Sequence, residues 1–371
     1  MNILLLNWMD MANPVAGGAE VHLTEIFRRF VARGDKVTLV SSGFEGGSSL
    51  DEYHGIRIIR TGTRETYNFS VPRLVRKLDR QENFDIVVED INKVPLFTPL
   101  YLKKPILVTI PHLFGASVFR ETNPLVASYV YLMERPIPFV YRHAFFEVIS
   151  ESTAHDIEKR GIAPDKISVV HCGMDHDTYH IDTGIEKFDQ PTILYVGRLK
   201  RYKSVDVVIR ALPLIRKQIP EARLAIVGSG DGLNELKKLC AELAVSEHVV
   251  FTGFVTTAEK VDWMRRSHVI VNPSPKEGWG LTNIEANACG TVAVASNTDG
   301  LRDSVRDGVT GLLFPYGDHK ALAGQVVHLF DDADMRERLT KNALTWAKRF
   351  TWDGAARKTM EIVDEIVKVT K

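Results

Sequence analysis

Short runs of apolar residues alternate with amphipathic segments of helical period along the whole chain. Apolar runs bounded by turn residues predict buried strands, whereas apolar residues spaced three and four apart predict helices. Leu23, Phe27 and Phe30 form one face of a predicted helix over residues 18–33, which Gly34 is suited to end. The strands predicted in the first half are residues 2–7, 36–41, 56–60, 85–89, 105–110 and 145–149. Those predicted in the second half are residues 192–196, 223–227, 248–251, 269–271, 292–294 and 311–314.

This alternation of strands and helices predicts parallel sheets built from β-α-β units. The pattern starts again after the polar stretch 181–190, so we expect an α/β chain with two doubly wound, Rossmann-like domains. The length of 371 residues also exceeds one ordinary domain of roughly 100–200 residues. Ligands of such sheets bind at the carboxyl ends of the strands, and we therefore expect the two domains to face each other across a cleft.

Composition and charge narrow the class of protein. Lys and Arg total 47, as do Asp and Glu, so the formal net charge is zero, which argues against broad binding to nucleic acid. Cys172, Cys240 and Cys289 are too few and too far apart for a disulfide framework or a paired redox motif. The first residues lack the features of a signal peptide, and no apolar run approaches the ~18 residues of a membrane span. A cytoplasmic enzyme is expected.

The richest candidate site lies where Glu277 and Glu285 stand eight residues apart, the first in a loop after a buried strand and the second on the next helix. Gly278 and Gly280 would let the backbone approach a ligand, and the N–H groups at the helix start form an anion site. Glutamate near a helix start can also be a solvated cap, but its combination with two glycines and a strand favours a ligand role. The candidate ligand-binding residues here are Glu277, Gly278, Trp279, Gly280, Leu281, Thr282 and Glu285.

Two further loops carry groups that suit phosphate. Gly17 and Gly18 open the first helix, and their N–H groups could cradle phosphate oxygens, although a tight turn that only packs the helix is the alternative. In the second half, Gly197 is followed by Arg198 and Lys203. Arg supplies a planar fork of donors and Lys a compact charge, which are the usual ways to neutralise a diphosphate.

Weaker candidates follow other strands. Gly228 lies in a loop that only loosely matches a phosphate-binding pattern, and Phe254 with Val255 could place backbone groups against a nucleobase or form a plain loop. His112 follows a buried strand of the first domain, where its imidazole could bind a sugar hydroxyl or stabilise positive charge; a purely structural histidine is the alternative.

Two patterns that suggest a metal are judged to be coincidental. Asp175-His176-Asp177 matches an Asp-x-Asp metal motif, but it lies beside the domain junction and away from the candidate phosphate loops. His171, Cys172, His176 and His180 have no spacing that would present them as a tetrahedral set. No metal and no cofactor are therefore expected.

Taken together, these residues resemble the retaining glycosyltransferases of family 4, which have the GT-B fold. The resemblance spans nearly the whole chain and departs at Cys172, where the family has Asn before the glycine of a hinge loop. The residues that carry it are Gly17, Gly18, Ala19, Glu20, His112, Gly197, Arg198, Lys203, Glu277 and Glu285. It implies an acceptor-binding domain over 1–183, a nucleotide-sugar domain over 184–350 and a final helix over 351–371 that packs back on the first domain.

The resemblance also implies roles for individual residues. Gly18, Arg198 and Lys203 would contact the donor diphosphate, Glu277 the sugar hydroxyls and Glu285 the ribose. The catalytic residues would be His112, Arg198, Lys203 and Glu277.

The implied reaction moves a hexose from a UDP- or GDP-sugar to a hydroxyl of a glycan, a lipid-linked molecule or a small molecule, without metal. Retention could proceed by front-face attack with the donor phosphate as base, because no carboxylate pair in the first-domain loops is an obvious nucleophile. A sugar-nucleotide epimerase of the same fold and a non-catalytic partner subunit that binds nucleotide sugars are the alternatives. The sequence does not indicate an oligomeric state.

Residues 117–146 are apolar with scattered basic side chains. Such a segment could rest on the inner face of a membrane and meet a lipid-linked acceptor, or it could be ordinary core of the first domain.

Overall fold

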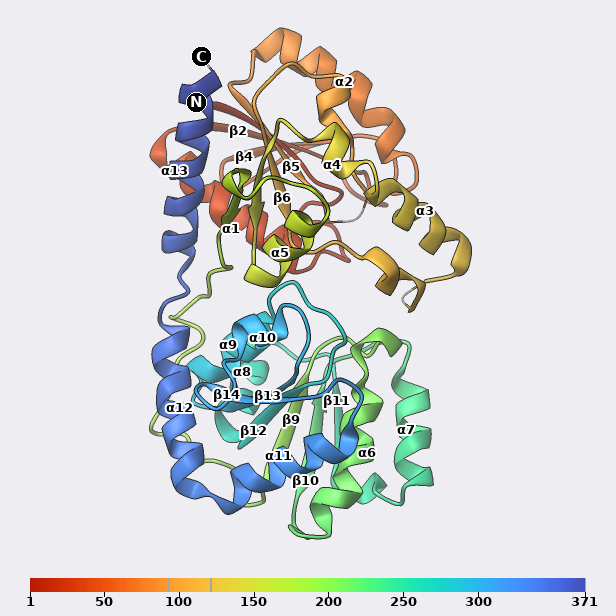
Figure 1. The fold of residues 1–371 in the computed structure, drawn as a ribbon, viewed down its shortest axis with the longest axis vertical. Helices are drawn as coiled ribbons and strands as arrows, with labels where there is room; N and C mark the ends of the chain where they lie inside the picture. Colours follow the sequence, from red (N-terminus) through yellow and green to blue (C-terminus); the bar gives the residue numbers. More distant parts are fainter. Residues whose placement is uncertain (93, 121, 371) are drawn as a thin grey trace. The chain divides into compact units, whose positions relative to one another are not determined.

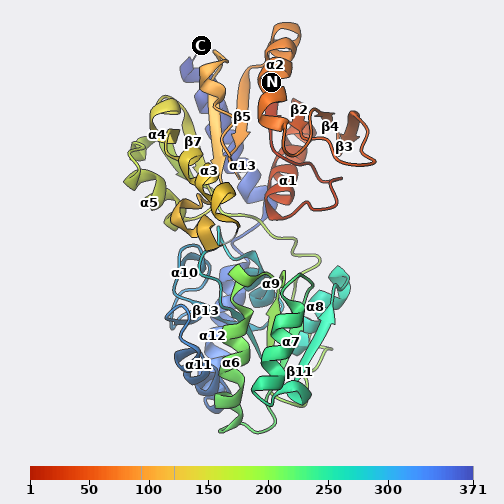
Figure 2. The same cartoon turned by 90° about the vertical axis from the view of Figure 1, so that its right-hand side faces the viewer.

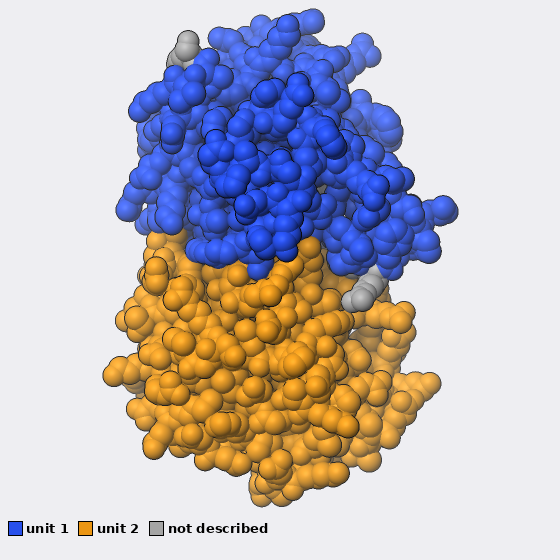
Figure 3. Space-filling model, in the orientation of Figure 1, with its two compact units in different colours: residues 1–173, 352–371 blue, residues 174–351 orange. Residues whose placement is uncertain are grey.

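The computed structural model describes residues 1–92, 94–120 and 122–370, although nothing is described of the Arg120 side chain. The chain forms two compact units, which Figure 3 colours separately. Unit 1 comprises residues 1–173 and 352–371, and unit 2 comprises residues 174–351. The predicted domain boundaries after residues 183 and 350 stay predictions.

Unit 1 is built on an eight-stranded sheet with the order β3-β4-β2-β1-β5-β6-β7-β8 (Figure 1). Its strands are β1 (Asn2–Leu6), β2 (Lys36–Ser41), β3 (Leu50–Tyr53), β4 (Ile56–Arg60), β5 (Ile86–Asp90), β6 (Ile106–Ile110), β7 (Phe145–Val148) and β8 (Ile167–Val169). Its helices are α1 (Gly18–Arg33), α2 (Tyr67–Glu82), α3 (Pro124–Glu134), α4 (Ile137–Val140), α5 (Glu151–Lys159) and α13 (Trp352–Thr370), with short 3-10 turns η1 (Thr98–Leu100), η2 (Gly115–Arg120) and η3 (Pro164–Lys166). Neighbouring strands are parallel except for β3 and β4, which form an antiparallel hairpin at the edge.

The six strands predicted in this half are confirmed to within one residue at each end, but β3 and β8 were not predicted. Each residue of β3 is exposed, so no alternation of apolar and polar positions marks it. β8 is three residues long and only half-buried. Both missed strands lie at the edges of the sheet, where burial leaves the weakest pattern.

Unit 2 contains a six-stranded, wholly parallel sheet with the order β11-β10-β9-β12-β13-β14. Its strands are β9 (Thr192–Val196), β10 (Arg223–Val227), β11 (Val249–Gly253), β12 (Val269–Asn272), β13 (Val292–Ser296) and β14 (Gly311–Phe314). Its helices are α6 (Val205–Arg216), α7 (Leu233–Glu242), α8 (Thr257–Arg266), α9 (Leu281–Ala288), α10 (Leu301–Ser304), α11 (His319–Asp331) and α12 (Ala333–Ala347), with the 3-10 turns η4 (Arg201–Lys203) and η5 (Ser246–His248). All six strands predicted here are confirmed, and the prediction of two doubly wound α/β domains is confirmed with them.

The final helix, α13, belongs to unit 1 although the chain has passed through unit 2 before it. It lies beside α1 in both views (Figure 1, Figure 2). Arg29 of α1 pairs with Asp353 at 2.5 Å, and Arg33 pairs with Asp364 at 3.0 Å. The prediction that the last helix returns to the first domain is confirmed. No helix within the described residues is long and apolar enough to cross a bilayer.

A buried carboxyl group lies where α13 covers the sheet of unit 1. Glu147 of β7 is 1% exposed and hydrogen-bonds to Thr359 of α13. Burial raises the pKa of Glu147 to about 7, against an opposing effect of the Thr359 bond. Glu147 is therefore expected to be protonated in the folded protein at mildly acidic pH.

We expect Glu147→Gln to stabilise unit 1 relative to the wild type as pH rises. The folded pKa lies above the unfolded value of 4.5, so the unfolded chain releases its proton first as pH rises. The unfolding free energy of the wild type therefore decreases between pH 4.5 and 7. Gln does not ionise, so the difference in unfolding free energy between the two proteins should shift by about 3 kcal/mol across this range in favour of Gln. Urea unfolding from pH 4.5 to 8 measures the shift.

The exposed Glu361 of α13 provides the matched control, because Glu361→Gln removes an acid from the helix that carries Thr359, at a position open to solvent. Its stability should follow that of the wild type at every pH. Parallel curves for Glu147→Gln and the wild type would contradict the buried, protonated carboxyl.

Candidate functional site

The loops that follow the strands of unit 2 meet at one edge of its sheet, because all six strands run in the same direction. The loop after β9 carries Gly197, Arg198 and Lys203, and the loop after β12 carries Glu277. Predicted residues that are far apart in the sequence are therefore gathered at this edge.

The loops after β9, β10 and β11 are joined by backbone hydrogen bonds. The N–H of Gly197 donates to the carbonyl of Val227 at 3.0 Å, and the N–H of Gly228 donates to Gly253 at 2.9 Å. A Cβ atom on Gly228 would lie 2.0 Å from the carbonyl oxygen of Gly197, and the φ of Gly228 is +138°. Gly228 is therefore required for the close packing of the loops after β9 and β10. Phe254, in the adjoining loop, is 86% exposed and Val255 is half-buried.

Lys203 and Glu277 form an ion pair at this edge. The Nζ atom of Lys203 donates to Oε1 of Glu277 at 2.5 Å, and the two side chains are 17% and 20% exposed. Burial alone would lower the pKa of Lys203, but the Glu277 carboxylate more than offsets this and raises it. Arg198 lies five residues before Lys203 and is exposed. The backbone carbonyl of Arg198 accepts a hydrogen bond from the Tyr195 hydroxyl at 3.1 Å. A charged cation and a carboxylate are thus held together at the sheet edge.

The second glutamate of the motif is also paired. Glu285 on α9 is 6% exposed, and both of its carboxylate oxygens accept from Nζ of Lys260 on α8, at 3.1 and 3.0 Å. The hydroxyl of Tyr179 also donates to Glu285. Burial raises the pKa of Glu285, while Lys260 and Tyr179 act in the opposite direction.

The loop that carries Glu277 leads directly into the start of α9. Gly278 and Gly280 precede the helix, and the N–H groups of Leu281 and Thr282 belong to its first turn, which has no helical acceptor for them. The N–H of Glu277 donates to the carbonyl of Asp299 at 3.2 Å, so the loop after β13 holds the loop after β12 in place.

Trp279 was predicted to bind the ligand, but its side chain is buried. It is 2% exposed, and its ring contacts the ring of Phe350 edge-on, with centroids 5.1 Å apart. Only the backbone of Trp279 is suited to contact a ligand in this arrangement.

The candidate residues of the first half lie in unit 1. The N–H of Gly17 donates to the Glu20 carboxylate at 2.8 Å, which closes a capping box at the start of α1. The N–H of Gly17 is therefore already hydrogen-bonded to a side chain of the protein. Gly18 is the first residue of α1 and has open space beside its Cα atom. His112 is half-buried after β6, and its ring contacts Phe114 edge-on at 5.0 Å.

The Asp-x-Asp motif folds into a turn of its own. Asp175 accepts from the N–H of Asp177 at 3.0 Å and from the hydroxyl of Thr178 at 2.5 Å, while His176 hydrogen-bonds the carbonyl of Phe350. Over the residues that the structure describes, no group of three or more His, Cys, Asp or Glu side chains is placed to hold a metal ion. Independence from metal stays a prediction.

Three residues of this edge were missed by the sequence analysis: Lys260, Tyr179 and Gly300. Lys260 and Tyr179 reach Glu285 from separate parts of the chain, and no short spacing connects them with it. Gly300 follows Asp299 in the loop after β13, and an Asp-Gly pair shortly after an apolar strand is a turn signal that could have identified this loop.

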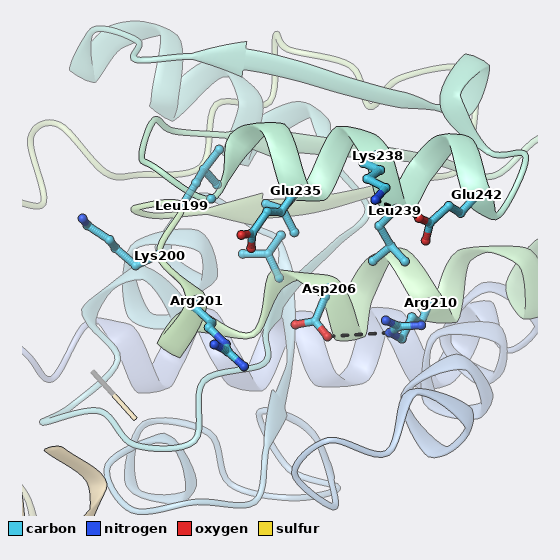
Figure 4. Close-up of a pocket in the computed structure, with 12 residues that line it drawn as sticks. Leu199, Lys200, Arg201, Asp206, Arg210, Glu235, Lys238, Leu239 and Glu242 are labelled. Atoms are coloured by element: carbon cyan, nitrogen blue, oxygen red, sulfur yellow. Dashed lines mark ion pairs between the residues drawn. The ribbon is translucent and has the colours of Figure 1, made fainter. Parts of the chain in front are cut away.

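A separate groove of about 480 Å³ lies between α6 and α7 (Figure 4). Four of its charged side chains pair along their own helices: Asp206 with Arg210 at 3.7 Å, and Lys238 with Glu242 at 3.9 Å. Lys200 and Arg201 line it, but Lys203 and Glu277 do not. We assign no ligand to this groove.

Comparison with protein families gives two matches that together cover most of the chain. The model described as "Glycosyl transferases group 1" matches residues 180–346, and the model described as "Glycosyltransferase Family 4" matches residues 16–178. The first coincides with most of unit 2, and the second lies almost wholly within the first segment of unit 1.

Individual relatives and solved structures agree with these matches. A D-inositol 3-phosphate glycosyltransferase of Streptomyces scabiei is 35% identical over 54% of this chain and 48% of that protein, so the chain spans about half the length of this relative. One of Frankia alni is 27% identical over 92% of this chain and 93% of its own. Sucrose-phosphate synthase from Thermosynechococcus elongatus superimposes with a TM-score of 0.83, at 21% identity over 99% of both chains. At that identity the superposition establishes the fold alone.

Proposed function

Because this chain belongs to the family 4 glycosyltransferases, which have the GT-B fold, we propose that it transfers a hexose from a nucleoside-diphosphate sugar to a hydroxyl acceptor. The observation that carries the proposal is the Lys203–Glu277 pair at the carboxyl edge of the unit 2 sheet. In this proposal Lys203 neutralises the departing diphosphate, and Glu277 accepts hydrogen bonds from the sugar hydroxyls.

Sugar transfer passes through a flattened, positively charged ring while negative charge grows on the diphosphate. Arg198, Lys203 and the first turn of α9 supply positive charge and N–H donors for the leaving group without a metal. Glu277 is hydrogen-bonded to Lys203 in the absence of a donor. A bound donor must therefore either separate the two side chains or bind to both while they stay paired.

The anomeric configuration is retained in this proposal by front-face attack, with the donor phosphate accepting the proton of the acceptor hydroxyl. His112 of unit 1 is proposed to contact the sugar. Trapping a covalent glycosyl-enzyme with a fluorinated donor would contradict the front-face route.

A thermal-shift panel with UDP, GDP, ADP and their sugar conjugates, with and without EDTA, tests donor binding. UDP is the first choice, since Anabaena HepE was solved with UDP and glucose and matches this chain with a TM-score of 0.79 at 18% identity. A nucleotide at 100 times its dissociation constant should add about 2.7 kcal/mol of stability, or several degrees. A selective shift that survives EDTA is the expected result; well-folded protein that responds to no nucleotide would contradict the proposal.

The acceptor is sought first among inositol phosphates, because the relatives of this chain in Streptomyces and Frankia carry that name. Incubation with D-inositol 3-phosphate and the selected sugar nucleotide, followed by mass spectrometry, is expected to show the mass of one added hexose. The absence of that product with an active donor would direct the search to glycans and lipid-linked hydroxyls.

The protein is also proposed to contact the inner face of a membrane through α3 and α4. Leu125, Leu132 and Phe139 are 85%, 59% and 78% exposed, so this part of residues 117–146 is not ordinary core. The one acid among residues 122–146 is Glu134, which is buried and accepts from the N–H groups of Phe114 and Gly115. Arg135 is exposed, so the surface suits anionic lipid. Glu121 lies outside the described residues.

We expect the protein to float with anionic vesicles, and the double variant Leu125→Glu, Leu132→Glu to lose most of this binding. Two leucines that become buried in the bilayer would contribute roughly 1.5–3 kcal/mol each, so the bound fraction should fall at least about tenfold. The control carries Leu50→Glu and Phe69→Glu, which change exposed apolar residues on other elements of unit 1. Equal flotation of the two double variants, or a wild type that stays in the soluble fraction, would contradict the proposed surface.

A further inference from the structure

Lys260 and Glu285 form a largely buried ion pair between α8 and α9. Glu285 lies one turn into α9, and Lys260 lies in the first turns of α8, which begins shortly after the loop of Phe254 and Val255. Both residues are therefore close to the edge of the sheet proposed to bind the donor. The side chain of Glu285 is 9% exposed and that of Lys260 is 23% exposed.

A third residue completes the arrangement. The Nζ atom of Lys260 lies over the ring of Tyr179, 4.7 Å from its centroid, while the Tyr179 hydroxyl donates to Glu285. The ring face attracts the ammonium group and the hydroxyl binds the carboxylate, so Tyr179 fixes both partners. Two side chains from separate segments, Lys260 and Tyr179, thus hold the Glu285 carboxylate in a single orientation.

We propose that Lys260 is a positioning residue that pairs with the buried Glu285 and orients it so that its free lone pair accepts a hydrogen bond from a ribose hydroxyl of the donor. This inference rests on the proposed function. A carboxylate offers about four lone pairs, of which Lys260 takes up to two and Tyr179 one, so at least one remains.

The charge of Lys260 decides what Glu285 can do. Burial raises the pKa of Glu285 and Lys260 opposes this effect. Without the ammonium group the pKa of the buried carboxyl rises further, which favours the protonated form, and in that form one oxygen is a donor that cannot accept from a hydroxyl. A buried ion pair is in general a poor source of stability, which favours a role in binding over a role in folding.

Lys260→Met tests the inference through affinity and its dependence on pH. The probe is UDP or GDP, whichever the thermal-shift panel selects, with its 2′-deoxy and 3′-deoxy analogues, measured by calorimetric titration from pH 6 to 8.5. We expect Lys260→Met to weaken binding about tenfold relative to the wild type at pH 6.5, because the ribose hydroxyl loses its hydrogen bond to an oriented, charged carboxylate. The deficit should shrink as pH rises and Glu285 ionises.

The deoxy analogues locate the lost interaction. In the wild type, one of the two analogues should bind about tenfold more weakly than the parent nucleotide, and in Lys260→Met this penalty should largely disappear at pH 6.5. Lys260→Arg keeps the charge and is expected to restore both the affinity and the flat pH profile. Lys260→Gln is the second variant should Lys260→Met fail to fold, with the same expected loss.

The outcomes separate the inference from the proposed function. If the nucleotide binds the wild type but Lys260→Met or Lys260→Gln shows the same affinity, pH profile and deoxy penalty, Lys260 has no role in positioning and the inference is wrong. If no nucleoside diphosphate binds the wild type, the proposed function fails and the inference fails with it.

Discussion

Lys203→Met is expected to lower kcat/KM for the sugar-nucleotide donor by about 10²–10³-fold, the usual cost of removing one preorganised charge from a developing anion. Lys203 is mostly buried and touches Glu277 at 2.5 Å, so Met of similar length fills its space but leaves the carboxylate without its cation. The loss should fall on kcat as well as on KM, because charge on the diphosphate grows towards the transition state. Initial rates over a range of donor concentrations separate the two parameters.

Lys200 supplies the matched control for this variant. It stands three residues earlier in the same loop, but it points to the surface, where it pairs with Asp231 at 2.7 Å. Surface pairs of this kind contribute little, and Lys200→Met should stay within about twofold of the wild type. Similar losses in the two variants would mean that Lys203 acts through the general charge of the loop and not at the leaving group.

The sequence located the loops of the site better than the contacts within them. Parallel strands must present their carboxyl ends at one edge, so finding the strands was enough to place Arg198, Lys203 and Glu277 on the same side of a sheet. The direct pairing of Lys203 with Glu277 depends on the turn η4, which brings together residues 74 positions apart. No local pattern encodes that distance.

Contacts between residues on different helices could not be predicted from the sequence for a similar reason. Lys260 reads in the sequence as one more charged residue on the polar face of α8, and the residue that it binds lies on another helix. Tyr179 lies in a segment without regular structure, where no period predicts the direction of a side chain. Trp279 shows the opposite case, since its place among the glycines suggested contact with a ligand and its ring is buried against Phe350.

Gly300→Ala is expected to damage both the stability of unit 2 and the activity, because the loop after β13 supports the loop that carries Glu277. A Cβ atom on Gly300 would lie 2.1 Å from the carbonyl oxygen of Glu277 and 2.9 Å from the carbonyl carbon of Gly278. Backbone atoms cannot rotate away as a side chain would, so the Glu277 loop must shift. A displacement of about 1 Å at a catalytic group can cost 10²-fold in rate.

Gly317→Ala separates this collision from the strain of the backbone itself. Gly317 has a φ of +80° and Gly300 a φ of +76°, but nothing lies within 4 Å of a Cβ on Gly317. Gly317→Ala should therefore cost only the roughly 1–2 kcal/mol of a left-handed conformation. Gly300→Ala should cost a further 1–3 kcal/mol for overpacking and lower kcat/KM at least about tenfold, while Gly317→Ala keeps full activity. Urea unfolding and donor kinetics on both variants measure these effects. Equal stability and equal activity of the two variants would contradict the prediction. They would mean that the loop after β13 adjusts without moving Glu277 and that other contacts hold the Glu277 loop.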